Sequence, residues 1–378
     1  MAQGMALTKG ARITVGVLCL LFFLWTACWM VVDLAEFGVA GVWGSWTGTL
    51  VPGPNEVTDP VQLGFCLLQL TAALAALAGR RSAGGLLAVA TTATFATALQ
   101  ALVSVGSHTS DERWFRSATS GTAVFDLVFV GSMGLFLLSL VAGVVLLAGM
   151  RSWPRPSPTT PPARPAGPAA VLGGLVLGAM ALGYLAWQVY ILVQGGSGTF
   201  KIFYLGKGAL STLLSLAPGW YSVVFFVLTA VAAINCLVRG CAARGLSLGL
   251  AIAFLPNAVF TVIALAGTGT LFRINGTMPG LSIIGDVQLA LDLFGSLVLV
   301  ALMVRGEPVG PAWQQPAPAP MFGAPGFVPG PVAPPPAGWQ QPGPPPMPPV
   351  GGPPMPPAPA VPPGIPQPPQ GGYGPPQY

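Results

Sequence analysis

Two polar side chains lie one helical turn apart in the last long apolar stretch of the sequence. Asp292 falls near the middle of residues 281–304, and Gln288 is four positions earlier, so both would project from one face of a helix. An acidic side chain inside a bilayer is costly and usually faces the interior of a helix bundle or a cavity. The pair is therefore a candidate site for a proton or a cation. The alternative is a structural role, in which Asp292 is paired with Arg116, Arg273 or a polar residue of another span.

Two further residues extend this candidate intramembrane polar site. Asp126 begins the apolar stretch 124–149, near the expected outer interface. Asn257 follows Pro256 in the middle of residues 246–267, where proline removes one backbone hydrogen bond of a helix. The amide of Asn257 could replace that bond or reach a neighbouring helix. Simple packing is the alternative.

The sequence contains no motif of a common enzyme class. There is no phosphate-binding loop, no nucleophile elbow and no H-E-x-x-H pattern. The one histidine, His108, is close to Asp111 and Glu112, but a histidine and two acids make a poor metal site without further ligands. We therefore expect no enzymatic activity, no bound metal and no cofactor.

The composition predicts an all-α integral membrane protein. Hydrophobic residues make up 53% of the 378 residues and charged residues only 7%, whereas a soluble domain is roughly 25% charged. Most of the chain is therefore expected to have the lipid bilayer as its partner. The net charge of +5 does not indicate nucleic-acid binding, because the basic residues are scattered between apolar stretches and form no patch.

Eight apolar stretches are each long enough to cross about 30 Å of hydrocarbon as a helix. The first exceeds the roughly 7–15 apolar residues of a signal peptide, so we expect it to be retained. Residues 35–60 are expected to form a loop, because Pro52, Pro54 and Pro60 interrupt any helix. The predicted transmembrane helices comprise residues 13–34, 61–79, 84–106, 124–149, 169–193, 219–238, 246–267 and 281–304.

Basic residues near the ends of these stretches predict the orientation, because they accumulate on the cytoplasmic side of a membrane. With both termini inside, ten basic residues fall on the inner side and five on the outer side. We therefore predict a multi-pass plasma-membrane protein with both termini in the cytoplasm.

The chain is predicted to divide at residues 151–168, a cytoplasmic linker rich in proline and arginine. The connections between helices run long, short and medium in both halves, which indicates internal duplication. Four helices per half would give two copies the same orientation, unlike the inverted repeats of many transporters. The alternative is that any eight-helix protein with short cytoplasmic turns has this plan. The predicted parts are a cytoplasmic N-terminus (1–12), two four-helix halves (13–150 and 169–305), the linker, and a tail (306–378).

The tail is predicted to be disordered and cytoplasmic. It contains 29 of the 42 prolines and a single charged residue, Glu307, so it has too little apolar content to form a core. Proline runs such as residues 353–357 are of the type that binds aromatic-lined grooves. The tail is therefore a candidate binding segment for a cytoplasmic protein, and an inert spacer is the alternative.

The Ala-, Gly- and Arg-rich, Lys-poor composition and the ending Gly-Tyr-Gly-Pro-Pro-Gln (residues 372–377) carry a resemblance. They resemble multi-pass membrane proteins of high-GC Gram-positive bacteria with proline-rich cytoplasmic tails. The resemblance implies the same architecture and no particular activity. The leading hypothesis is a non-enzymatic interaction or scaffold component that recruits partners through its tail. The alternative is a small-solute or ion transporter with Asp292 and Asp126 in its pathway.

Overall fold

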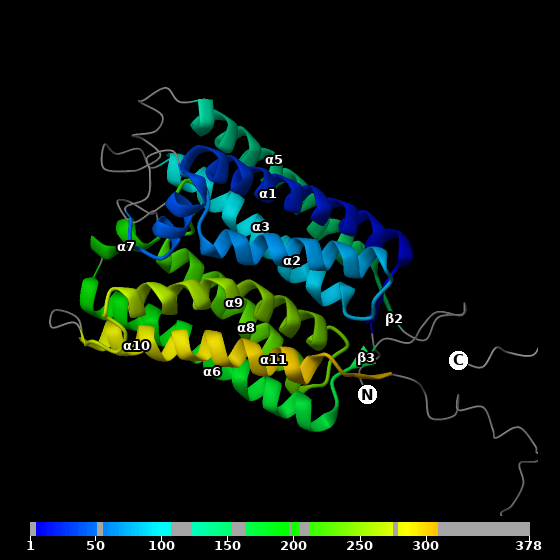
Figure 1. Cartoon of the computed structure of the whole chain (residues 1–378). Coiled ribbons are helices and arrows are strands. Elements are labelled where there is room, and N and C mark those ends of the chain that lie inside the picture. The colour runs from blue at the N-terminus through cyan, green and yellow to red at the C-terminus, as the bar shows by residue number, and fades with distance from the viewer. Residues whose placement is uncertain are drawn as a thin grey trace, which may run out of the picture. The chain divides into compact units, whose positions relative to one another are not determined.

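Eight helical stretches in the described part of the chain are long and apolar enough to cross a membrane. The computed structural model describes residues 5–50, 56–106, 123–152, 163–196, 198–204, 212–274 and 279–308. The helical class and the number of apolar helices agree with the sequence-based prediction. The long helices are α1 (Lys9–Trp46), α2 (Pro60–Leu77), α3 (Ala83–Gly106), α5 (Ala123–Gly149), α6 (Gly167–Gly195), α8 (Pro218–Leu237), α9 (Ala243–Gly267), and a last one formed by α10 (Pro279–Ala290), η1 (Leu291–Gly295) and α11 (Ser296–Met303) (Figure 1).

The first helix continues beyond the predicted end at residue 34, so the expectation that residues 35–60 form one loop is wrong. The prolines that interrupt a helix come later, and α1 reaches Trp46. Gly38 lies inside it with φ 69° and ψ 170°, a conformation that glycine adopts without steric cost. The helix therefore turns at Gly38, and its last two turns remain helical.

The helices pack in the same order in both halves of the chain (Figure 1). In the first half, α1 packs against α2 and α5, and α3 packs against α2 and α5. In the second half, α6 packs against α8 and the α10–α11 helix, and α9 packs against the same two elements. The halves meet where α9 lies against α2 and α3.

Glycines allow the backbones of the two halves to approach closely. A Cβ atom at Gly85 would lie 2.6 Å from the carbonyl oxygen of Ala242, and one at Gly245 would lie 2.7 Å from the Cα of Gly85. Phe65 and Phe225 also meet, with ring centroids 6.1 Å apart. Gly85 and Gly245 are 160 positions apart in the chain, and so are Phe65 and Phe225. Residues at equal spacing therefore contact each other across the interface.

Two short antiparallel ribbons close the halves at one end. In the first half, β1 (Met5–Leu7) pairs with β2 (Met150–Ser152), and in the second half, β3 (Ala163–Arg164) pairs with β4 (Glu307–Pro308). In Figure 1, β2 and β3 lie at the end of the helices opposite the short helix α7 (Gly198–Phe203). Each half thus begins and ends at the same level.

The turns that join α2 to α3 and α8 to α9 have the same hydrogen bonds. The N–H of Gly79 donates to the carbonyl of Ala76, and the N–H of Arg239 donates to that of Cys236. Both residues have positive φ, 70° at Gly79 and 53° at Arg239. Arg239 therefore occupies a position that favours glycine, while its guanidinium donates to the Glu307 carboxylate at 2.9 Å.

We expect Arg239→Gly to be more stable than Arg239→Ala by about 1 kcal/mol. Both variants lose the exposed ion pair with Glu307, which contributes about 0–1 kcal/mol. Only glycine relieves the left-handed backbone, which costs a residue with a side chain roughly 1–2 kcal/mol. Equilibrium unfolding in detergent micelles measures the difference, and Gly79→Ala, which adds the same strain to the other turn, is the matched control. Equal stabilities of the two Arg239 variants would contradict the expectation.

Candidate functional site

Asp292 lies inside η1, a π-helical turn that interrupts the last long helix. Its carboxylate is buried, with 7% of the residue exposed, and it accepts two hydrogen bonds. The Tyr184 hydroxyl donates to Oδ2 at 2.9 Å, and Nε2 of Gln288 donates to Oδ1 at 2.7 Å. Single π-turns of this kind occur often at functional sites. The acid is thus held by one residue of its own helix and one residue of α6.

Aromatic rings surround the Tyr184 side of this network. The ring centroid of Tyr184 is 6.1 Å from that of Tyr221, 6.4 Å from Phe225 and 5.9 Å from Phe254. The Tyr221 side chain also interacts with Asn257. Among the residues described by the structure, no basic side chain forms an ion pair with Asp292. The carboxylate therefore has hydrogen-bond donors but no opposite charge beside it.

The structure brings together part of the predicted candidate site. Gln288 and Asp292 share one helix face and bond to each other, and Asn257 is linked to them through Tyr221 and Tyr184. Asp126 is exposed on α5, which packs against α1 and α3 of the other half. The expectation that Asp126 and Asp292 line one pathway has no support in this arrangement.

Sequence reasoning missed Tyr184 and Asp33. Tyr184 is a hydroxyl-bearing side chain near the middle of an apolar stretch, and that position was the available signal. Asp33 lies at the end of the first apolar stretch and is 1% exposed. Its carboxylate accepts from the backbone N–H groups of Val57 and Thr58, and from the Thr58 hydroxyl at 2.6 Å. Asp33 therefore stabilises the connection that leads into α2.

That connection pairs with a segment of the second half to form what we call the loop pair, residues 56–59 and 212–217. The N–H of Leu213 donates to the carbonyl of Glu56 at 3.0 Å, and the N–H of Leu214 donates to that of Val57 at 2.9 Å. Nε2 of Gln62 donates to the Leu214 carbonyl at 2.8 Å. The loop pair ties the two halves together at the end away from the ribbons.

Asp59 connects the loop pair to α2. Its side chain accepts from the N–H of Gln62 at 3.1 Å, as the N-cap of the helix, and from the Ser215 hydroxyl at 3.0 Å. Burial raises the pKa of Asp59 above its usual value of 3.8, although both hydrogen bonds act in the opposite direction. The folded protein therefore binds a proton at Asp59 more tightly than the unfolded chain does.

We expect wild type to lose stability as the pH rises, and we expect Asp59→Asn to abolish this pH dependence. Because the folded pKa is raised, wild type loses free energy of unfolding as pH increases from 3.8 through the folded pKa, and none below 3.8. Asparagine keeps the N-cap hydrogen bond and has no charge. The stability of Asp59→Asn relative to wild type should therefore increase with pH, as measured by unfolding in micelles from pH 4 to pH 8. Asp286→Asn is the control, and a constant difference between Asp59→Asn and wild type would contradict the expectation.

A neutral polar network occupies the core of the first half. The Thr26 hydroxyl donates to Oε1 of Gln69 at 3.2 Å, and Nε2 of Gln69 donates to the Thr94 hydroxyl at 2.9 Å. These side chains line a cavity of about 10 Å³, enough for about one water molecule. The two networks therefore differ in chemistry, since the one around Asp292 contains an acid and the one around Gln69 consists of neutral side chains.

Eight helices that are long and apolar enough to cross a membrane are typical of the class of multi-pass helical membrane proteins. In comparisons with known proteins, no family model, no curated protein and no solved structure matches this chain. His108, Asp111 and Glu112, which the sequence indicates would make a poor metal site, lie outside the described residues. Within the described residues, no group of three or more His, Cys, Asp and Glu side chains could hold a metal ion.

Proposed function

We propose that this protein is a plasma-membrane transporter of a small solute or ion that binds and releases a proton at Asp292. The observation that carries the proposal is a buried carboxylate with two hydrogen-bond donors and no ion-pair partner among the described residues. Ionisable groups at such positions mark proton relays and ion pathways in membrane proteins. Tyr184 and Gln288 both direct hydrogen-bond donors at the carboxylate, whereas a metal ion would require oxygen lone pairs directed at the site. The arrangement therefore favours a proton over a metal ion as the bound species.

The network can accommodate both protonation states of Asp292. The ionised carboxylate accepts from Tyr184 and from Gln288, as observed. A protonated carboxyl group becomes a donor and needs an acceptor. Oε1 of Gln288 is buried and has no hydrogen-bond partner among the residues that the structure describes, so rotation of that amide would supply an acceptor. Proton binding would thereby be coupled to a side-chain movement at the π-turn.

Proton binding is tested by infrared difference spectroscopy of the protein in liposomes during a pH titration. We expect a protonated-carboxyl signal in wild type that Asp292→Asn lacks and Asp286→Asn retains. Asparagine has the size of aspartate and keeps an acceptor for Tyr184, so the variant should fold. The same signal in wild type and Asp292→Asn would overturn the assignment.

Transport is tested separately, by proton flux into liposomes that contain a pH-sensitive dye. With the membrane potential clamped, wild type should dissipate an imposed pH difference faster than protein-free liposomes do. Asp292→Asn should reduce this flux at least tenfold, and Glu36→Gln, at an exposed acid of α1, should leave it unchanged. Wild-type flux equal to that of protein-free liposomes would contradict transport, whatever the infrared result.

A scaffold role for the proline-rich tail is the second proposal, favoured by where the tail begins. Its one charged residue, Glu307, is in β4 and pairs with Arg239, so the tail leaves the helices at the ribbon end. The runs of proline in the tail are of the type that binds aromatic-lined grooves. Deletion of residues 309–378 keeps the ribbon and should remove bound proteins in a pull-down. An unchanged set of bound proteins would count against the scaffold role.

We further propose that the halves are parallel copies of one unit, with both termini in the cytoplasm. Matched contacts support the duplication. A Cβ at Gly16 would lie 3.7 Å from the carbonyl oxygen of Ala73, and one at Gly174 would lie 3.4 Å from that of Ala233. The excess of basic residues at the ribbon end supports the orientation. A phosphatase fused after Arg305 should be inactive in cells, and an active fusion would contradict the orientation.

A further inference from the structure

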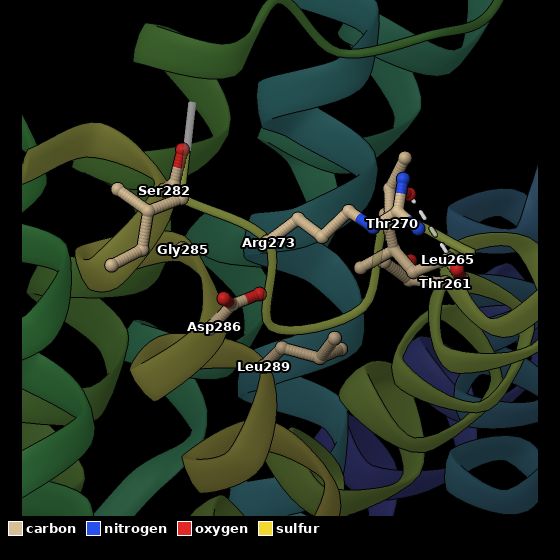
Figure 2. A pocket seen from close by; sticks show the side chains of 9 residues that line it. Thr261, Leu265, Thr270, Arg273, Ser282, Gly285, Asp286 and Leu289 are labelled. Carbon is tan, nitrogen blue, oxygen red and sulfur yellow. Dashed lines mark hydrogen bonds between the residues drawn. The ribbon is translucent and has the colours of Figure 1, made fainter. Parts of the chain in front are cut away.

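A hollow of about 510 Å³ opens between α9 and α10, at the end of these helices away from the ribbons (Figure 2). Its walls come from the last turns of α9, from the connection that follows, and from the first turns of α10. The residues that line it are Thr261, Leu265, Thr270, Arg273, Ile274, Ser282, Gly285, Asp286 and Leu289. The Asp292 network does not contribute to this lining.

The hollow contains one positive and one negative side chain. Figure 2 shows Arg273 reaching across it from the connection and Asp286 facing it from α10. The structure shows no ion pair or side-chain hydrogen bond of either residue with any residue that it describes. Both charges are therefore accessible to a ligand. A guanidinium suits phosphate, which it can bind through two parallel N–H groups, and a carboxylate suits an ammonium group.

Exposed aliphatic side chains flank the charges on the outside of the helix bundle. Ile274 is 62% exposed, Ile283 50% and Val287 53%, as expected for side chains in contact with lipid. The hollow lies where α9 ends at Gly267 and α10 begins at Pro279. Asp286 is seven residues into α10, about 10 Å along the helix. With the start of α10 at the outer edge of the headgroup region, about 5–8 Å thick on each side, this depth would lie near the boundary between headgroups and acyl chains.

We propose that the hollow binds an amine-bearing phospholipid, with Arg273 on the phosphate and Asp286 on the primary ammonium group. The adjacent aliphatic side chains would contact one acyl chain. A lipid with a phosphate and no amine would leave the Asp286 carboxylate without a partner and place a second negative charge near it. This inference rests on the membrane location of the helices and is independent of proton binding at Asp292.

The test is native mass spectrometry of the full chain released from nanodiscs that contain equal amounts of phosphatidylethanolamine and phosphatidylglycerol. Wild type should retain phosphatidylethanolamine preferentially. Asp286→Asn should lower its apparent affinity for that lipid about tenfold, the loss of one charge-assisted contact, and should leave phosphatidylglycerol binding no weaker. Arg273→Gln should weaken both lipids. Arg305→Gln, at the other end of the last helix, is the matched control and should change neither.

Two results would overturn the proposal. One is equal retention of the two lipids by wild type. The other is retention of phosphatidylethanolamine by Asp286→Asn at the wild-type level. Soluble glycerophosphoethanolamine serves as the arm for a free headgroup, and displacement of the lipid at equal concentration would assign the hollow to a soluble zwitterion instead. Both positions face the hollow and not the core, so both variants should elute as wild type does.

Discussion

Gly85→Val is expected to prevent the two halves from packing and to lower the stability of the protein by at least about 3 kcal/mol. A Cβ at Gly85 meets the backbone of the α9 helix start, including the Ala242 carbonyl oxygen at 2.6 Å. Backbone atoms cannot rotate away as a side chain can, and overpacking a close contact costs about 1–3 kcal/mol even where side chains can adjust. Valine adds two further methyl groups to the same contact. The helices would have to separate.

The neighbouring glycine supplies the control for this prediction. A Cβ at Gly84 has nothing within 4 Å, and alanine is the better helix former by about 1 kcal/mol. Gly84→Ala should therefore be as stable as wild type or slightly more stable. Size-exclusion profiles after heating, followed by fluorescence, compare the variants. A Gly85→Val protein with the thermal midpoint of Gly84→Ala would show that the close backbone approach does not matter.

Tyr184→Phe is expected to destabilise the protein by about 1.5–3 kcal/mol in the wild-type background and by almost nothing when Asp292 is leucine. The Tyr184 hydroxyl donates to the buried carboxylate at 2.9 Å, and a hydrogen bond to a charged group contributes about 1.5–3 kcal/mol. Once the carboxylate is absent, the hydroxyl has no acceptor there to lose. The difference between the two backgrounds is the coupling energy of the pair.

Equilibrium unfolding of the four proteins in mixed micelles yields this cycle, and a second tyrosine of α6 provides the control. The structure shows no hydrogen bond from the Tyr190 hydroxyl to any residue that it describes, so Tyr190→Phe should have the same small effect with Asp292 or leucine at position 292. Equal effects of Tyr184→Phe in both backgrounds would show that the hydrogen bond does not stabilise the fold.

The helices were predictable because their apolar stretches are long and uninterrupted. The pairing of Gln288 with Asp292 was predictable for a local reason, since residues four apart share a helix face. The extension of α1 to Trp46 was not predictable. The prolines at positions 52, 54 and 60 show where a helix can no longer continue, but nothing in the sequence shows how far before them the helix ends. Gly38 can adopt the conformation of the bend without steric cost, but a glycine by itself does not indicate that the helix resumes after it.

The remaining contacts of the site depend on which helices meet, and no local pattern contains that information. Sequence reasoning left the partner of Asp292 open between Arg116, Arg273 and a polar residue of another span, and the structure supplies the Tyr184 hydroxyl of α6, 108 positions away. It also grouped Asp126 with Asp292 on chemical type alone, and the two lie in different halves. Arg273 and Asp286 come together at the hollow because α9 and α10 are adjacent, although neither marks a site by spacing.

The ribbons β1–β2 and β3–β4 have a consequence for chain continuity. Each joins the beginning of one half to its own end, and the described contacts between halves come from the end of α1, from α2, α3, α8 and α9, and from the loop pair. All of these contacts are made by residues before position 153 or after position 162. Two separate polypeptides cut between these two positions would each keep their own ribbon and the complete set of interface residues. The architecture is therefore one that a pair of subunits encoded by two genes could assemble equally well.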